Sequence, residues 1–171
     1  MDAAIALYAS AAVLLVLAGA MKVLRPATTA ALLDDLGLPT LGPIDAVRLA
    51  VGLGAVEISL GVVALVGEIG AIAVGVGTLY VVFAVTVLRA MRVGAGSCGC
   101  FGRVDAPPSW WHVGDNLALA AAAFVAASGR SPLEVMEGQP AGGLGFVVVV
   151  GVLAGVELIV FTTAAGGGQR A

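Results

Sequence analysis

The two cysteines of this chain are separated by a single glycine. They lie in the run Cys98-Gly99-Cys100-Phe101-Gly102, and the chain contains no other cysteine. A disulfide closed between Cys98 and Cys100 would be a small, strained ring. Strain makes a disulfide easier to reduce, which favours a role in thiol–disulfide exchange. The spacing also fits two unreactive surface thiols or a static disulfide, and the residues alone leave these alternatives open.

Charged and metal-ligating side chains surround this pair in the sequence. Arg92 and Arg103 are expected to favour a cysteine thiolate by lowering its pKa. His112, the only histidine, adds a third potential ligand for zinc or copper, and Asp105 or Asp115 a fourth. The spacing matches no zinc motif, so we predict neither a metal nor a cofactor.

Two carboxyl groups interrupt long apolar segments. Glu57 and Glu157 each lie among aliphatic residues, where an ionisable side chain is costly and is a functional candidate. Lys22 is the first candidate partner for Glu57 and Arg48 is the second. Either carboxyl could instead be protonated. The alternative interpretation is a purely structural polar contact between helices.

Asp115 and Asn116 follow the cysteine-containing segment at the beginning of an apolar stretch. Their side chains could hydrogen-bond the cysteine loop and support its chemistry. They could equally serve the first turns of a helix, where aspartate interacts favourably with the positive end of the helix dipole.

The composition predicts a membrane protein. Hydrophobic residues make up 60% of the chain and charged residues 11%, and the mean hydropathy is +1.09. Soluble domains carry about a quarter charged residues, so most of this surface must face the lipid bilayer. The net charge of −3 and the scattered basic residues exclude a nucleic-acid patch.

Five apolar segments are long enough to cross a bilayer, which requires about 20 residues. They cover residues 3–21, 46–66, 69–88, 110–128 and 143–164. We expect a retained first helix rather than a cleaved signal peptide, a short interfacial helix over residues 28–36, and a polar loop over residues 129–142. Gly151 and Gly155 have a spacing that allows close helix packing.

The predicted fold is an all-α polytopic transmembrane helix bundle, a four-helix core plus a fifth C-terminal helix. Residues 1–128 form the four-helix membrane domain, with the Cys-Gly-Cys loop at residues 93–109. Residues 129–171 comprise the polar loop, the fifth transmembrane helix and a short tail.

Basic residues are unevenly distributed between the two predicted faces of the membrane. One face carries Lys22, Arg25, Arg48, Arg89, Arg92, Arg103 and Arg170, and the other carries Arg130. Because basic loops remain cytoplasmic, this predicts an outside N-terminus and a cytoplasmic cysteine loop in a multi-pass protein of the cell membrane.

The chain resembles the methylamine-utilisation protein MauE family, within the broader DoxX-like group of membrane proteins. The resemblance covers most of the chain. It rests on the end of the first helix at residues 18–26, Glu57, the Cys-Gly-Cys-Phe-Gly run, Trp111 and residues 115–117. It implies a redox-associated membrane protein. The namesake is thought to help processing, transport or disulfide maturation of the methylamine dehydrogenase small (beta) subunit, and relatives occur beside or fused to thioredoxin-like modules.

Carried onto this sequence, the resemblance makes Cys98 and Cys100 the redox pair, with a thioredoxin-fold protein or an exported substrate protein as partner. Such a protein would be a thiol–disulfide oxidoreductase, although the residues do not decide whether it is an enzyme. The alternatives are a non-enzymatic membrane scaffold with structural cysteines, or a metal- or small-molecule-handling protein using Glu57 and the Cys/His cluster. Maturation of an exported substrate requires the cysteines outside, which conflicts with the distribution of basic residues.

Overall fold

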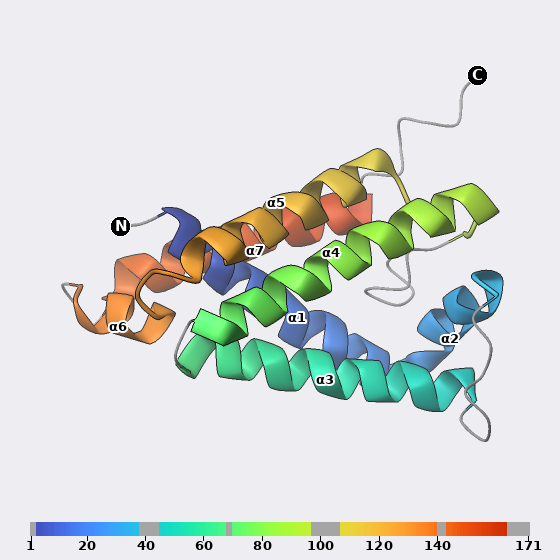
Figure 1. Ribbon diagram of the computed structural model, residues 1–171, viewed down its shortest axis with the longest axis horizontal. Coiled ribbons are helices and arrows are strands. Elements are labelled where there is room, and N and C mark those ends of the chain that lie inside the picture. Colours follow the sequence, from blue (N-terminus) through green and yellow to red (C-terminus); the bar gives the residue numbers. More distant parts are fainter. Residues whose placement is uncertain (1–2, 38–44, 68–69, 97–106, 140–142, 164–171) are drawn as a thin grey trace.

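In the computed structural model every regular element is an α-helix throughout the part of the chain that is described. This part comprises residues 3–37, 45–67, 70–96, 107–139 and 143–163. The long helices are α1 (Ala3–Leu24), α3 (Ala46–Val66), α4 (Gly70–Val93), α5 (Trp110–Ala126) and α7 (Leu144–Thr163). The short helices are α2 (Pro26–Asp35) and α6 (Pro132–Glu137). The predicted all-α bundle is therefore confirmed (Figure 1).

In the described part of the chain, three helices are long and apolar enough to span a membrane. The mean hydropathy of the best window is 2.2 in α1 and 2.3 in both α3 and α4. Helix α7 contributes a shorter apolar stretch, Leu144–Val160, and α5 has 17 residues. That α5 and α7 also cross the bilayer stays a prediction. On the outer faces of α3 and α4, Val56 and Val85 are each 59% exposed, as expected for side chains in contact with lipid.

Helix α1 is the centre of the bundle. Of its apolar window 61% is buried, against 28% for α3 and 33% for α4. Tyr8, Leu14 and Leu15 of α1 belong to the main core cluster, which they share with residues of α3, α4 and α5. The Tyr80 hydroxyl of α4 donates a 2.8 Å hydrogen bond to the Ala11 carbonyl and so ties α4 to the central helix.

Glycines bring α1 and α3 into close contact. A Cβ atom on Gly19 would lie 2.5 Å from the Gly54 carbonyl oxygen, and one on Gly54 would lie 2.6 Å from the Gly19 carbonyl oxygen. Only hydrogen fits at these two positions, because any side chain would overlap backbone. Gly151 and Gly155 of α7, whose spacing suggested such an approach, have no described neighbour within 4 Å of the position that a Cβ atom would occupy. Close packing therefore occurs at a glycine pair whose sequence spacing gave no signal.

Several boundaries differ from those expected from hydropathy. Helix α4 continues to Val93, past the end predicted at residue 88, and is stopped by Gly94 with a φ of 70°. Near this end the Arg89 guanidinium donates a 2.6 Å hydrogen bond to the Leu36 carbonyl after α2, and Ala90 is buried against Leu32 and Leu36. The short helix predicted over residues 28–36 is present as α2, which begins two residues earlier at Pro26. Its position at the membrane interface stays a prediction.

Part of the predicted polar loop is also helical. Helix α6 lies within residues 129–142, where we expected loop alone. The Ser131 hydroxyl accepts from the Glu134 amide at 3.2 Å, and the Glu134 carboxylate accepts from the Ser131 amide at 2.9 Å. This reciprocal capping box, with Pro132 in the first helical position, is a sequence pattern typical of a helix N-terminus. A prediction based on hydropathy alone does not detect it.

Candidate functional site

A buried ion pair links α1 to α3. Lys22 Nζ lies 2.8 Å from Glu57 Oε2, and the two side chains are only 6% and 2% exposed. Lys22, the first of the two candidates from the sequence, is therefore the partner of Glu57. Arg48 instead faces solvent 3.9 Å from Asp45, with both side chains more than half exposed. Asp45 also caps α3 by accepting a 2.7 Å hydrogen bond from the Arg48 amide.

The glycine contact between α1 and α3 determines the geometry of this pair. Gly19 precedes Lys22 by three residues and Gly54 precedes Glu57 by three residues, so each glycine lies one turn before its charged neighbour. A Cβ on Gly54 would lie 3.0 Å from the Lys22 Cβ. The backbones approach closely at the glycines, and the side chains of Lys22 and Glu57 meet beside this contact.

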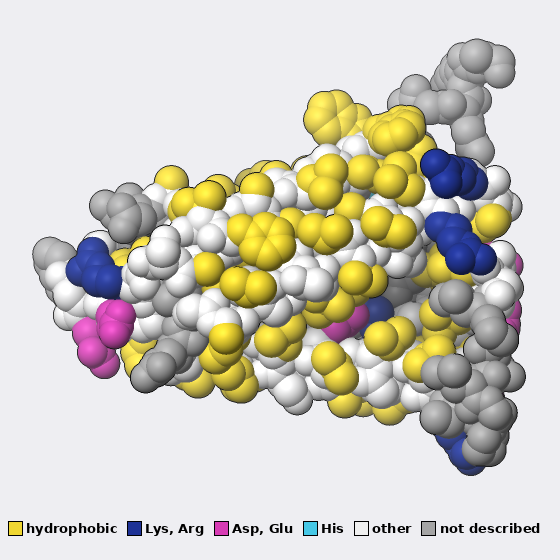
Figure 2. Space-filling view, viewed as in Figure 1, with side chains coloured by type: hydrophobic (Ala, Val, Ile, Leu, Met, Phe, Trp, Pro, Cys, Tyr) yellow, Lys and Arg dark blue, Asp and Glu magenta, His cyan; other side chains and the backbone are white. Residues whose placement is uncertain are grey.

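The ion pair is not fully satisfied by its own two members. Glu57 Oε1 is buried and has no hydrogen-bond partner, while Lys22 Nζ lies 5.6 Å from the centre of the Phe83 ring on α4. Figure 2 shows mainly hydrophobic side chains over the middle of this face, with one acidic and one basic side chain at the bottom of a hollow between α3 and α4. These two helices diverge from their connection (Figure 1).

The C-terminal end of α4 leads into the cysteine-containing segment and is held in a defined conformation. The Gly94 amide donates to the Met91 carbonyl at 3.3 Å and the Ala95 amide to the Ala90 carbonyl at 3.0 Å. With the positive φ of Gly94, these bonds form a Schellman motif. Ala95 is buried in a small cluster with Leu32, Leu36 and Ala90, so the segment leaves α4 against α2.

The segment rejoins the described structure at the beginning of α5, which is also fixed. The Ser109 amide donates a 3.1 Å hydrogen bond to His112 Nδ1, and the Ser109 hydroxyl lies 2.9 Å from the same nitrogen. His112 is fully buried, and a ring nitrogen used in this cap is not presented to a metal. The Asn116 amide group donates a 2.6 Å hydrogen bond to the His112 carbonyl within the same helix.

The predicted redox residues fall outside the described part of the chain. Cys98, Cys100 and Arg103 all lie within residues 97–106, as does Asp105, which was considered only as a possible metal ligand. Their mutual geometry and a contact between the loop and Asp115 or Asn116 stay predictions. No group of three or more His, Cys, Asp or Glu side chains that could hold a metal occurs among the described residues.

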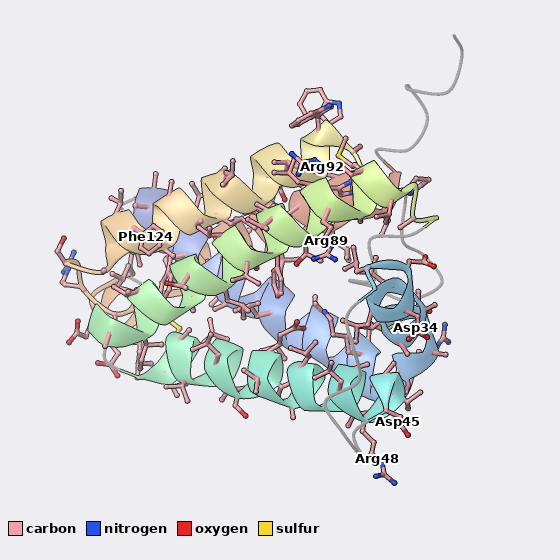
Figure 3. The ribbon with its side chains drawn as sticks, turned by 45° about the vertical axis from the view of Figure 1, so that its right-hand side comes forward. Asp34, Asp45, Arg48, Arg89, Arg92 and Phe124 are labelled. Atoms are coloured by element: carbon pink, nitrogen blue, oxygen red, sulfur yellow. The ribbon has the colours of Figure 1, made fainter. Side chains whose placement is uncertain are left out.

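Charged side chains gather at the end of the bundle where this segment begins. Figure 3 shows Arg89 and Arg92 on α4 at the same end as Asp34, Asp45 and Arg48. Arg89 and Arg92 are both exposed. Three of the basic residues assigned to one membrane face are thus brought to one end of the molecule, while the side on which this end lies stays a prediction.

A second buried carboxyl contact joins α1 to α7. The Ser10 hydroxyl lies 3.1 Å from Glu157 Oε1, and Ser10 and Glu157 are 0% and 7% exposed. The sequence singled out Glu157 but not Ser10 as part of a site. Apart from the Tyr8 hydroxyl, Ser10 nevertheless carries the only polar side chain in the apolar segment of residues 3–21, and this could have marked it in the sequence.

These features define a polytopic helical membrane protein with a buried ion pair and a cysteine pair beyond the end of α4. The chain belongs to the MauE family, because residues 2–129 match the family described as Methylamine utilisation protein MauE. It is therefore a membrane protein of a family associated with methylamine utilisation. No curated protein and no solved structure matches the chain.

Proposed function

We propose that this protein is a membrane thiol–disulfide redox protein that assists disulfide formation in an exported partner protein. The observation that carries the proposal is the Cys98-Gly99-Cys100 pair, placed between two structurally fixed helix ends. Membership of the MauE family supports a role in the maturation of a protein of amine metabolism.

The exchange would use the disulfide between Cys98 and Cys100 as a two-electron oxidant. A thiolate of the partner attacks one sulfur of the pair, which forms a mixed disulfide and releases the other sulfur as a thiolate. A second thiolate of the partner then attacks its own sulfur in the mixed disulfide. The partner leaves as a disulfide, and Cys98 and Cys100 are left reduced. The disulfide of a thioredoxin-fold protein would accept these two electrons and restore the pair.

The described helix ends support this chemistry in two ways. The Schellman motif at Gly94 and the capping box at Ser109 fix where the cysteine-containing segment starts and ends. We therefore expect a visiting protein to react with the cysteine pair without disturbing the helices. Arg92 is exposed in the last turn of α4, where its positive charge would favour the departing thiolate.

The proposal is tested with serine variants of both cysteines. We expect Cys98→Ser and Cys100→Ser each to abolish maturation of the partner, because exchange needs two thiols. One of the two single variants should also accumulate a mixed disulfide with a thioredoxin-fold protein, detected by non-reducing electrophoresis and mass spectrometry. Ser97→Ala, next to the pair, is the matched control and should retain activity.

The scaffold alternative predicts the opposite result. If the helices alone bind the partner, the double variant Cys98→Ser/Cys100→Ser retains full activity in cells and traps no partner. The buried Lys22–Glu57 pair favours this second candidate, because it stabilises the contact of α1 with α3 independently of any redox chemistry. Insertion of all variants into the membrane must be equal for the comparison to hold.

A further inference from the structure

An apolar groove lies where α1, α3, α6 and α7 come together. Its volume is about 310 Å³, and it is lined by Ala9 and Val13 of α1, Leu65 of α3, and residues of α6 and α7 that include Met136 and Phe146. None of the described residues that line it carries a charged, hydroxyl or amide side chain. The groove therefore offers no partner to a polar ligand, and it is large enough for an apolar one.

The groove is completed by the part of the chain beyond the family match. The match ends at residue 129, whereas α6 and α7 follow it. Val135 of α6 is 3% exposed in a cluster with Phe146 of α7 and with residues of α1. A Cβ atom on Gly143, whose φ is 76°, would lie 2.7 Å from the Met136 carbonyl oxygen, so α7 begins directly against α6. These contacts give the α6 end of the groove a defined shape.

The groove is open along α7. Two of its lining residues, Val147 and Gly151, are exposed, and Gly151 has no described neighbour within 4 Å of the position of a Cβ atom. Water does not fill a wholly apolar space, because it finds no hydrogen-bond partner there. An empty groove would leave its lining atoms without van der Waals contacts. In a bilayer the molecule that supplies these contacts is a lipid acyl chain.

Charged side chains lie at the α6 end of the bundle, where Figure 2 shows acidic and basic groups together. Arg130 is exposed, stands two residues before the groove residue Pro132, and makes no ion pair among the described residues. A guanidinium group is suited to binding a phosphate. Glu134 and Glu137, both exposed on α6, attract an ammonium group and repel a headgroup with a net negative charge. The charges at this end thus complement a zwitterionic headgroup.

We propose that this groove binds a zwitterionic phospholipid of the phosphatidylethanolamine type. One acyl chain lies between α3 and α7, Arg130 binds the phosphate, and the acidic side chains of α6 attract the ammonium group. Lipid tails are as apolar as the groove, so packing and headgroup charge, rather than hydrophobic burial, distinguish this lipid from its neighbours in the bilayer. The site does not depend on the proposed redox role.

Native mass spectrometry of the full chain, reconstituted with palmitoyl-oleoyl-phosphatidylethanolamine and released from detergent micelles, tests the site. We expect one retained lipid per chain. Gly151→Leu should remove it, because the new side chain occupies the groove. Gly155→Leu is the matched control: this position, one turn further along α7, is equally open but does not line the groove. Absence of a retained lipid in the unmodified protein, or equal retention in the two leucine variants, overturns the proposal.

The headgroup is tested with a surface variant that keeps the experiment decisive if Gly151→Leu does not fold. Arg130→Gln should weaken retention of the lipid about fivefold, the effect of one basic residue near a membrane surface. Arg48→Gln, at the other end of the bundle, should leave it unchanged. Diacylglycerol and phosphatidylglycerol with the same acyl chains should both be retained less. Equal retention of either lipid, or an unchanged Arg130→Gln, refutes the headgroup site, and a lipid-free dimer shows that a second copy of the chain fills the groove instead.

Discussion

The buried Lys22–Glu57 pair makes a quantitative prediction about how α1 and α3 are held together. Replacing Glu57 by leucine removes the counter-charge 2.8 Å from an ammonium group whose side chain is only 6% exposed. Removing one partner of a buried pair in a soluble protein costs about 3–5 kcal/mol. Polar contacts between membrane helices contribute less, up to about 1.7 kcal/mol. We therefore expect Glu57→Leu to lower the free energy of unfolding by about 2 kcal/mol.

Companion variants separate the charge from the hydrogen bond. Glu57→Gln keeps an acceptor for Lys22 and should largely preserve the fold, with a loss under about 1 kcal/mol. Lys22→Met should cost about 2 kcal/mol, because it leaves a carboxylate whose Oε1 already lacks a partner. The double variant Lys22→Met/Glu57→Leu leaves no uncompensated charge and should also cost about 2 kcal/mol, rather than the sum of about 4 kcal/mol.

Reversible unfolding in mixed detergent micelles, followed by circular dichroism, measures these differences. Arg48→Met is the control, because the Arg48 side chain is 73% exposed and its pair with Asp45 spans 3.9 Å. Exposed pairs contribute below about 1 kcal/mol, so this variant should change stability little. If the double variant equals the sum of the single variants within about 0.5 kcal/mol, the two side chains are not coupled and the argument from their geometry is refuted.

Three further predictions concern packing, helix capping and orientation. Gly19→Ala should lower the free energy of unfolding by about 1–3 kcal/mol in the same assay, because its Cβ would overlap the α3 backbone. Gly52→Ala has open space around it and should leave this free energy unchanged. Equal effects of the two variants would contradict the close contact. Ser131→Ala should lower thermal stability by about 1 kcal/mol through loss of the α6 capping box, and an unchanged melting temperature would argue against it. If the basic residues determine the orientation, a membrane-impermeant thiol reagent should fail to label reduced Cys98 and Cys100 in intact cells. Labelling from outside would show that the predicted topology is wrong, and it would agree with an exported substrate.

Local composition was sufficient to predict the class of protein and most of its helices. A run of about 20 apolar residues must form a helix in a bilayer, because each backbone polar group needs a partner within its own segment. The predicted bounds of residues 46–66 agree with α3, and those of the other long helices differ by a few residues at their ends. The Cys-Gly-Cys pair is likewise recognised from the sequence alone, because its two cysteines are separated by a single residue.

The tertiary structure decided which distant residues meet. The sequence offered Lys22 and Arg48 for Glu57, and the rotation of α1 against α3 selected Lys22. It offered the glycines of α7 for close packing, but the close backbone contacts occur between α1 and α3, at Gly19, Gly54 and Gly61. These outcomes depend on how two helices are rotated and displaced relative to each other. An apolar helix in lipid has little amphipathic pattern to reveal that rotation, so it is determined only when the helices pack.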